Sequence, residues 1–259
     1  MRLLCLDVRN ASTTVGVFED EDLLDTWQVS TDARRTADEW GFLVTGLVER
    51  SQLMDDLDGA CVSSTVPAAL DEIRVMLAAH GSGLHTVVVG PGVRSGLSVL
   101  MDNPREVGTD RVANAVAAVA LVGGPCIVVD FETATTFDVI DKLGRYVGGA
   151  IAPGIETSVT ALGEHAAQLR QVVVERPRAV IAKNTVEALQ SGAVFGFAAQ
   201  VEGMVARIAA ELDTDVDAIE VIATGHQGSA VIAECQVFTR HEPYLTLAGL
   251  RLIYERNPS

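Results

Sequence analysis

The chain has 259 residues, 48% of them hydrophobic, and a formal net charge of −16 at pH 7. This length and composition allow one large domain or two compact ones around a sizeable core, and they argue against a disordered chain. An acidic surface repels nucleic-acid phosphates and anionic lipids, so we expect neither nucleic acid nor a membrane as partner. The opening MRLLCLDV meets Asp7 too early for a signal peptide, and no segment is expected to reach transmembrane length, which predicts a cytoplasmic protein.

The cysteines Cys5, Cys61, Cys126 and Cys235 are widely separated in the sequence, and no CxxC pair occurs. Paired cysteines at short spacing are typical of zinc or redox sites, and this pattern is missing. We therefore expect buried free thiols.

The first predicted elements are three short strands at residues 2–8, 13–18 and 23–29, separated by polar or glycine-containing turns. This arrangement is typical of a β-meander. A helix is expected over about 36–51, where apolar residues recur at helical spacing behind a Thr-x-x-Glu capping box.

The chain then returns to a strand at 59–67, followed by a helix over 68–81 and a strand at 85–90. Further on, a long helical pattern covers 184–212 and contains a Gly-x-x-x-Gly spacing that allows another helix to approach closely. A strand that ends in a glycine turn and an amphipathic helix over 245–257 close the sequence.

The strand order of the opening begins again at residue 126, in CIVVDFETATTFDVID and the following RYVGGAIA. Equivalent positions are Asp7 and Asp130, Arg9 and Glu132, and the pairs Thr13–Thr14 and Thr135–Thr136. We interpret this self-similarity as a duplicated domain, with copies at 1–122 and 123–259 that face one another across a cleft. Coincidence is the alternative, because apolar strands that end in aspartate are common.

Two strands that end in aspartate before a tight polar hairpin suit phosphate and metal binding. Hairpin amides point at phosphate oxygens, while Asp7 and Asp130 hold a hydrated magnesium ion. A third piece, ATGH at 223–226, ends a strand in a turn where a nucleotide could rest. Together these pieces resemble the split ATP site of the actin, sugar kinase and heat-shock ATPase superfamily, which implies an α/β fold of two ribonuclease-H-like domains with mixed sheets.

Longer segments resemble a type III pantothenate kinase, and they run nearly from end to end of the chain. They are DNPREVGTDRVANAVAA, VVDFETATTFDVID, GGAIAPGIETSVTAL, KNTVEALQSGAVFGF and LTLAGLRLIYERN. The resemblance implies a homodimer that phosphorylates pantothenate with ATP, Mg²⁺ and a monovalent cation in the first step of coenzyme A synthesis.

The resemblance also implies the acceptor-side residues. In the Gly-x-Asp-Arg element, Gly108 precedes Asp110, which takes or orients the acceptor's hydroxyl proton, and Arg111, which binds the acceptor's carboxylate. Thr185 matches a position that contacts the acceptor. The structural alternative for Asp110 and Arg111 is an acid at a helix N-terminus followed by a surface arginine.

The nucleotide-side loops depart from the family's pattern at glycines. The first loop keeps Asp7 and Asn10 but has Arg9 and Ala11. The second loop keeps Asp130 and Thr133 but has Glu132. The third loop has His226 after Thr224 and Gly225, and Ala182 precedes the Lys-Asn-Thr segment. Glycine at such positions permits positive φ or lets phosphate approach the backbone, and a strained substitute costs roughly 1–3 kcal/mol.

We expect weakened ATP binding from these departures, because Glu132 places negative charge beside a polyphosphate. We hypothesise that Arg9 and Glu132 pair and fill the space meant for phosphate; the alternative is that each points to solvent. His226 is interpreted as capping or packing, with a catalytic base as the less favoured alternative.

Two functions follow from the sequence. The main hypothesis is a catalytically impaired homologue that binds a pantothenate-like ligand or a partner, such as an active paralogue. The alternative is an active ATP-dependent kinase acting on pantothenate or a related hydroxy acid. DNA-binding regulation is disfavoured by the acidic charge.

Overall fold

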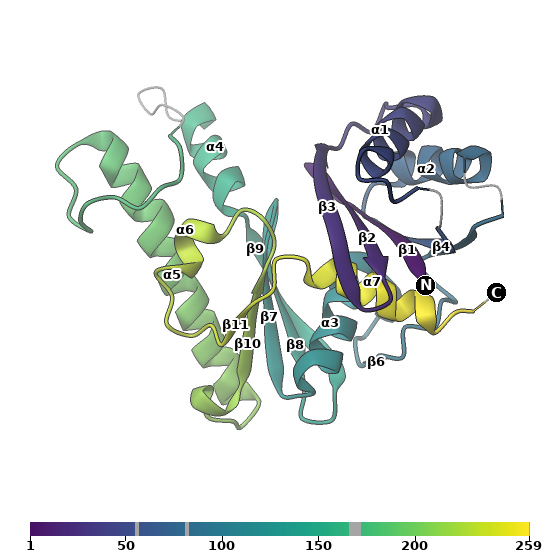
Figure 1. Cartoon of the computed structure of the whole chain (residues 1–259). Helices are drawn as coiled ribbons and strands as arrows, with labels where there is room; N and C mark the ends of the chain where they lie inside the picture. Colours follow the sequence, from purple (N-terminus) through teal and green to yellow (C-terminus); the bar gives the residue numbers. More distant parts are fainter. Residues whose placement is uncertain (55–56, 81–82, 166–171, 259) are drawn as a thin grey trace. The chain divides into compact units, whose positions relative to one another are not determined.

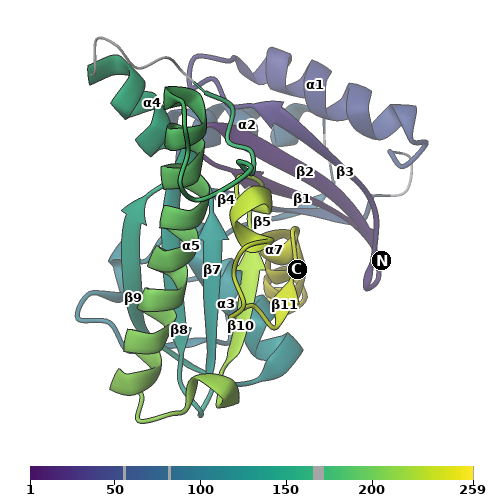
Figure 2. The same cartoon turned by 90° about the vertical axis from the view of Figure 1, so that its left-hand side faces the viewer.

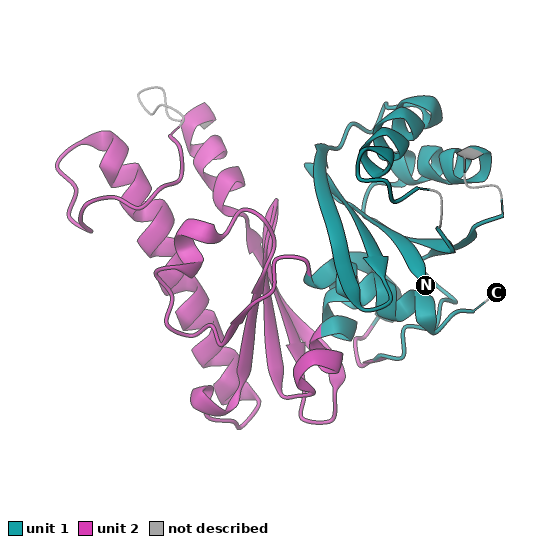
Figure 3. Ribbon diagram, viewed as in Figure 1, with its two compact units in different colours: residues 1–97, 103–117, 245–259 teal, residues 98–102, 118–244 magenta. Residues whose placement is uncertain are grey.

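The computed structural model describes residues 1–54, 57–80, 83–165 and 172–258, and these form two compact units (Figure 3). Unit 1 contains residues 1–97, 103–117 and 245–259, and unit 2 contains residues 98–102 and 118–244. The units differ in extent from the predicted halves because α7 (Leu245–Glu255), near the C-terminus, packs against β1 and β4 near the N-terminus. The predicted boundary between the duplicated halves, 1–122 and 123–259, stays a prediction.

Unit 1 is built on a mixed sheet with the strand order β3-β2-β1-β4-β5 (Figure 1). The strands are β1 (Arg2–Val8), β2 (Ser12–Glu19), β3 (Asp22–Ser30), β4 (Gly59–Ser64) and β5 (His85–Val88). β1 pairs antiparallel with β2 and parallel with β4, so the carboxyl ends of β1 and β4 meet at one edge of the sheet. The predicted meander is confirmed.

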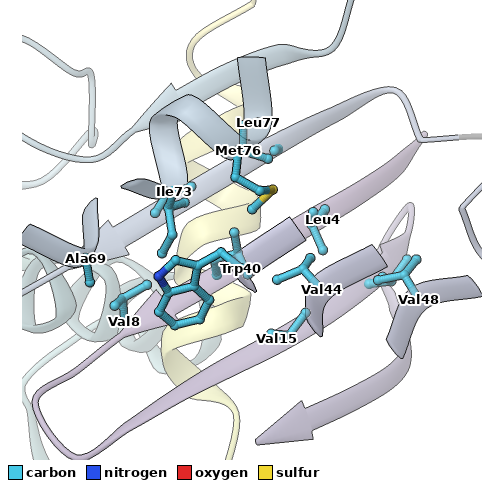
Figure 4. Close-up of a cluster of buried hydrophobic side chains, with 14 of the residues drawn as sticks. Leu4, Val8, Val15, Trp40, Val44, Val48, Ala69, Ile73, Met76 and Leu77 are labelled. Atoms are coloured by element: carbon cyan, nitrogen blue, oxygen red, sulfur yellow. The ribbon is translucent and has the colours of Figure 1, made fainter. Parts of the chain in front are cut away.

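Helices α1 (Ala37–Arg50) and α2 (Pro67–His80) pack on one face of this sheet. Figure 4 shows Trp40 of α1 beside Ile73 and Met76 of α2, and all three side chains are buried. Burial of a large apolar side chain contributes about 1.5–3 kcal/mol, so this cluster is a main source of stability for unit 1.

The predicted capping box at the start of α1 is confirmed. The Thr36 hydroxyl accepts a hydrogen bond from the Glu39 amide, and the Glu39 carboxylate accepts one from the Thr36 amide. Both bonds satisfy N–H groups that the first helical turn leaves without partners.

The opposite face of the unit 1 sheet packs against α7 and the first turns of α3 (Thr109–Val122). Leu3 and Cys5 of β1 point to this face, while Leu4 and Leu6 point to α1 and α2. Because side chains alternate along a strand, Asp7 belongs to the α3 and α7 face. This alternation brings the carboxylate to the helix whose sequence carries the predicted acceptor residues.

Unit 2 contains a second mixed sheet with the order β11-β10-β7-β8-β9-β6. Its strands are β6 (Ser98–Val99), β7 (Cys126–Phe131), β8 (Ala134–Ile140), β9 (Arg145–Pro153), β10 (Glu220–Thr224) and β11 (Arg240–His241). Its helices are α4 (Ile155–His165), α5 (Thr185–Glu211) and α6 (Ser229–Ile232). Short 3₁₀ turns lie at η1 (Pro104–Glu106) in unit 1 and η2 (Val216–Ala218) in unit 2.

Helix α5 lies along one face of the unit 2 sheet, as Figure 2 shows. Val201 and Val205 of α5 pack with Ile127 and Val129 of β7 in the core of this unit. Because side chains alternate along β7, Asp130 points to the face that α5 does not cover.

The two sheets share a topology, which supports the predicted duplication. A central strand, β1 or β7, pairs antiparallel with the next strand and parallel with a later one, β4 or β10. The equivalence of the threonine pairs follows from register: Asp7 lies opposite Thr14, and Asp130 lies opposite Thr136.

The expectation that no segment reaches transmembrane length is wrong for α5. Among the described residues it is the helix that is long and apolar enough to cross a membrane, judged by length and composition. A third of its most apolar window is buried inside the protein, and one such helix is weak evidence for a membrane span.

All four cysteines are free thiols, as expected, and Cys5, Cys61 and Cys126 are buried, whereas Cys235 is only partly buried. Cys5 and Cys61 face one another across β1 and β4, and both are buried. Burial raises the pKa of Cys61 to about 12, so its thiol stays protonated and unreactive at neutral pH.

Candidate active site

In unit 1, Asp7 lies near the end of β1 and belongs to a row of short polar side chains across the sheet. Thr14 of β2 and Ser63 of β4 are its strand partners on either side, and all three are buried. Partners in register point to the same face of a sheet. The row therefore collects a carboxylate and two hydroxyls at the edge where β1 and β4 end.

Arg9 turns back toward this row. Its Nε donates a hydrogen bond to the Asp7 Oδ2 at 2.6 Å, and a second guanidinium nitrogen donates to the Thr246 hydroxyl of α7 at 2.7 Å. Thr246 in turn donates to the Asn114 Oδ1 of α3 at 2.7 Å. Arg9 is only 9% exposed, so the alternative that it points to solvent is wrong.

The N-terminus of α3 carries the predicted acceptor-side residues. The Thr109 hydroxyl hydrogen-bonds with the Ser63 hydroxyl at 2.9 Å, which attaches the helix to the end of β4. The next residue, Asp110, has a buried Oδ1 with no hydrogen-bond partner among the described residues. A Cβ at Gly108 would lie 2.5 Å from this oxygen, so glycine leaves room for the carboxylate.

Helix α3 connects Asp110 and Arg111 to the first loop. Asn114 lies one helical turn after them on α3 and, through Thr246, joins the group that holds Arg9. The structure thus brings Asp7, Arg9 and the start of α3 together in unit 1.

In unit 2, Asp130 has the position that Asp7 has in unit 1. Thr136 of β8 and Thr224 of β10 are its strand partners, and Asp130 is 2% exposed. Both threonine hydroxyls are buried and have no hydrogen-bond partner within the described part of the chain. Buried hydroxyls normally find a partner, so this row has spare capacity to bind a ligand.

The turn after β10 packs directly on the turn after β7. Gly225 has a φ of +87°, and a Cβ there would lie 2.4 Å from the Phe131 carbonyl oxygen and 2.6 Å from the Asp130 Oδ1. Only glycine fits both the backbone conformation and the space. This glycine of the third loop is retained, although its neighbour is a histidine.

Glu132 bridges these two turns. Its Oε1 accepts one hydrogen bond from the His226 backbone N–H at 3.1 Å and another from the His226 Nδ1 at 3.0 Å. Glu132 is 8% exposed, which contradicts the alternative that it points to solvent. Its hypothesised pairing with Arg9 would join residues of different units and stays a prediction.

Of the two roles considered for glycine at these positions, positive φ does not apply to Arg9 or Glu132. Among the described residues other than glycine, positive φ occurs at Asp20, Gln52 and Asp213, not at Arg9 or Glu132. Each loop closes with an ordinary backbone bond, from the Arg9 amide in the first and from the Glu132 amide in the second. The substitutions therefore act through their side chains.

A pocket of about 510 Å³ opens beside the third loop in unit 2. Its volume is within the range of small-molecule sites. The residues around it are Glu156, Val159, Thr160, Val172, Val173, Val174, His226, Gln227, Ser229 and Ala230. The Gln227 Oε1 is buried without a hydrogen-bond partner among the described residues.

Four predicted site residues are exposed, and one of them is His226 in the third loop. Asn10 and Thr133 lie in the first and second loops, and Thr185 lies in the first turn of α5. Near Thr185, Arg178 donates hydrogen bonds to Glu187 and lowers the pKa of that carboxyl. The contact of Thr185 with an acceptor stays a prediction.

The oxygen-rich rows suit a hard cation. Mg²⁺ in phosphate-transfer sites typically uses one or two carboxylates and completes its shell with water and phosphate oxygens. Asp130, beside the hydroxyls of Thr136 and Thr224, fits this requirement, and Asp7, which binds Arg9, offers a second carboxylate. Among the described residues, no group of three or more His, Cys, Asp or Glu side chains could hold a metal alone.

Sequence reasoning missed Asn114 and Thr246. Each is a buried polar residue in an otherwise apolar helical stretch, and that contrast is a usable signal. Their hydrogen bond spans 132 positions of the chain, which the sequence pattern does not reveal.

Comparison with known proteins identifies close relatives. A family model described as type III pantothenate kinase matches residues 3–207. A type III pantothenate kinase of Nocardioides sp. is 55% identical over 99% of this chain and 100% of its own length. Another from Streptomyces avermitilis is 54% identical over 99% of both chains.

Solved structures support the fold at lower identity. A putative Baf family transcriptional activator from Campylobacter jejuni aligns with a TM-score of 0.60 at 16% identity, over 98% of both chains. A ROK hexokinase from Thermus thermophilus aligns with a TM-score of 0.53 at 14% identity, over 98% of this chain and 97% of its own. The chain therefore has the predicted actin-like ATPase fold, with two α/β units on mixed sheets.

Proposed function

We propose, from the premise that this chain belongs to the type III pantothenate kinase family, that it transfers the γ-phosphoryl group of ATP to the hydroxyl of pantothenate. Relatives of this name match the chain over its full length, and this favours the active kinase over the impaired homologue expected from the altered loops. The absence of strain at Arg9 and Glu132 removes one argument for impairment.

The observation that carries this proposal is the free carboxylate oxygen of Asp110. A buried oxygen without a partner is costly unless a ligand completes its hydrogen bonding. An acceptor hydroxyl beside the Asp110 Oδ1 gives its proton to Asp110 as the hydroxyl oxygen attacks phosphorus. Arg111 binds the acceptor's carboxylate. Arg9, held by Asp7 and Thr246, adds a fixed positive charge to the same unit.

The nucleotide is assigned to the loops of unit 2. The pocket beside His226 and Gln227 takes the nucleoside, and the row at Asp130 offers oxygens to the cation that accompanies the phosphates. Mg²⁺, when bound, neutralises the charge that develops on the phosphoryl oxygens. A monovalent cation belongs to the proposal through family membership alone.

We also propose a cytoplasmic homodimer. Val180 and Ile181, in the segment before α5, and Val186, in its first turn, are exposed apolar residues, and a Cβ at Gly192 or Gly196 of α5 would meet no atom within 4 Å. Exposed apolar residues and small residues close together in the sequence favour close packing with a second copy. Light scattering of the purified chain tests this, and a monomer at micromolar concentration would contradict it. An active paralogue is the alternative partner.

Single-turnover transfer from magnesium-ATP to pantothenate tests the activity. The native protein, Asp110→Asn and the double variant Arg9→Gly, Glu132→Gly are compared, with folding checked by circular dichroism. Phosphopantothenate from the native protein and not from Asp110→Asn supports the proposal. Product from the double variant alone would restore the impaired homologue, whose role lies in binding.

A further inference from the structure

The Glu132 carboxyl group is held by His226 in unit 2. One oxygen, Oε1, receives both the backbone N–H and the ring Nδ1 of His226, at 3.1 Å and 3.0 Å. The side chain of Glu132 is only 10% exposed, and that of His226 is 28% exposed. Two donors that converge on one largely desolvated oxygen form a site for a negative charge.

The backbone of the third loop suits the binding of a negative charge. Gly225, with its positive φ, turns the chain so that the next amide, that of His226, points away from the strand ladder. Amides that follow such a turn commonly bind phosphate or carboxylate oxygens. The Gln227 amide, by contrast, is bonded to the Phe131 carbonyl oxygen and holds the loop in place.

The anion site and the pocket share a residue. His226, whose amide binds Glu132, also lines the pocket of about 510 Å³, together with Gln227. Glu132 and a phosphate oxygen cannot both accept the same N–H bond, and their like charges repel each other.

We propose that the Gly225–His226 turn is a phosphate-binding site that Glu132 occupies as an internal anion in the ligand-free protein. A nucleotide phosphate enters by displacing the carboxylate, and Glu132 thereby sets the affinity for the nucleotide. This inference rests on the proposed kinase function. It assigns a specific role to Glu132, which competes for the site and leaves it when the nucleotide binds.

Nucleotide affinity in the absence of acceptor provides the test. Binding of magnesium-ATP and of inorganic phosphate is measured calorimetrically for the native protein, Glu132→Gln and Glu132→Gly. We expect a dissociation constant at least about tenfold lower for both variants. Glu211→Gln, at the exposed end of α5, is the control for net charge, with an unchanged dissociation constant.

The His226 backbone amide gives an independent readout by ¹⁵N nuclear magnetic resonance. Inorganic phosphate should shift this resonance at a lower concentration in Glu132→Gly than in the native protein. Unchanged or weaker nucleotide affinity in both Glu132 variants would overturn the inference, as would a His226 amide that phosphate never shifts. The kinase proposal fails on a different result, the absence of phosphopantothenate, so the two failures are distinguishable.

Discussion

The first loop of unit 1 and the second loop of unit 2 descend from the same strand-turn-strand arrangement but are held differently. In unit 1 the side chain in place of glycine is a cation, Arg9, which binds back to the aspartate of its own strand. In unit 2 it is an anion, Glu132, which binds forward to the next loop. Two equivalent positions thus carry opposite charges, and Arg9 binds its own strand and α7, whereas Glu132 connects the second loop to the third.

The largest effect is expected at the acceptor side, at the start of α3. Asp110→Asn should lower the single-turnover rate by about 10²- to 10⁴-fold, because the amide cannot accept a proton. Stability should change little, since the Oδ1 has no partner to lose among the described residues. Asp71→Asn on α2, which removes an exposed carboxylate, is the control, and a comparable rate loss there would contradict the assignment.

Next in size is the buried pair of the first loop. Arg9→Ala should destabilise the protein by about 3–5 kcal/mol, because it leaves the Asp7 carboxylate buried and without this partner. Urea denaturation measures the change. Arg34→Ala, which breaks a pair whose arginine is 91% exposed, should cost only about 0–1 kcal/mol. Equal losses for the two variants would contradict the importance of burial.

The close approach of the loops in unit 2 can be tested at Gly225. Gly225→Ala should cost about 1–3 kcal/mol from the positive φ alone, with a further cost from contact with the Phe131 carbonyl. Gly192→Ala in α5 meets no atom within 4 Å and should be neutral or stabilising by about 0.4–1 kcal/mol. Thermal unfolding of both variants measures the contrast, and a neutral Gly225→Ala would refute the packing argument.

Threonines in the two units should respond differently to the same change. Thr246→Val removes a hydroxyl that links Arg9 to Asn114 and should cost about 1–3 kcal/mol. Thr224→Val removes a buried hydroxyl without a described partner, so stability should stay the same or rise. Denaturation and magnesium-ATP binding are measured together, and Thr224→Val should lose nucleotide affinity only. A large stability loss at Thr224 would mean that its hydroxyl has a structural role.

The smallest effect concerns an exposed pair of unit 2, the counterpart of the buried Arg9–Asp7 pair. Arg178 donates to Glu187, which lowers the pKa of that carboxyl in the folded protein. A lowered folded-state pKa stabilises the fold above the carboxyl's unfolded pKa, and this contribution disappears as the pH falls through the folded value. Arg178→Gln should therefore reduce stability slightly at pH 7 and not in strong acid. A difference that grows with acidification would contradict this sign.

Sequence alone determined the elements that depend on local pattern. Apolar alternation identified the strands, the Thr-x-x-Glu motif located the start of α1, and the repeat of strand, aspartate and turn revealed two related halves. It also identified Asp7 and Asp130 as equivalent, since a short motif carries that information.

Only the tertiary structure decided which partners the charged loop residues take. Arg9 binds Thr246 across 237 positions, and Glu132 binds His226 across 94. The sequence left open whether positive φ or space for phosphate was the issue at Arg9 and Glu132, and the structure shows that neither residue has a positive φ. The physical reason is that φ at a turn and the partner of a buried charge depend on elements that return from distant parts of the chain, here α7 and the turn after β10.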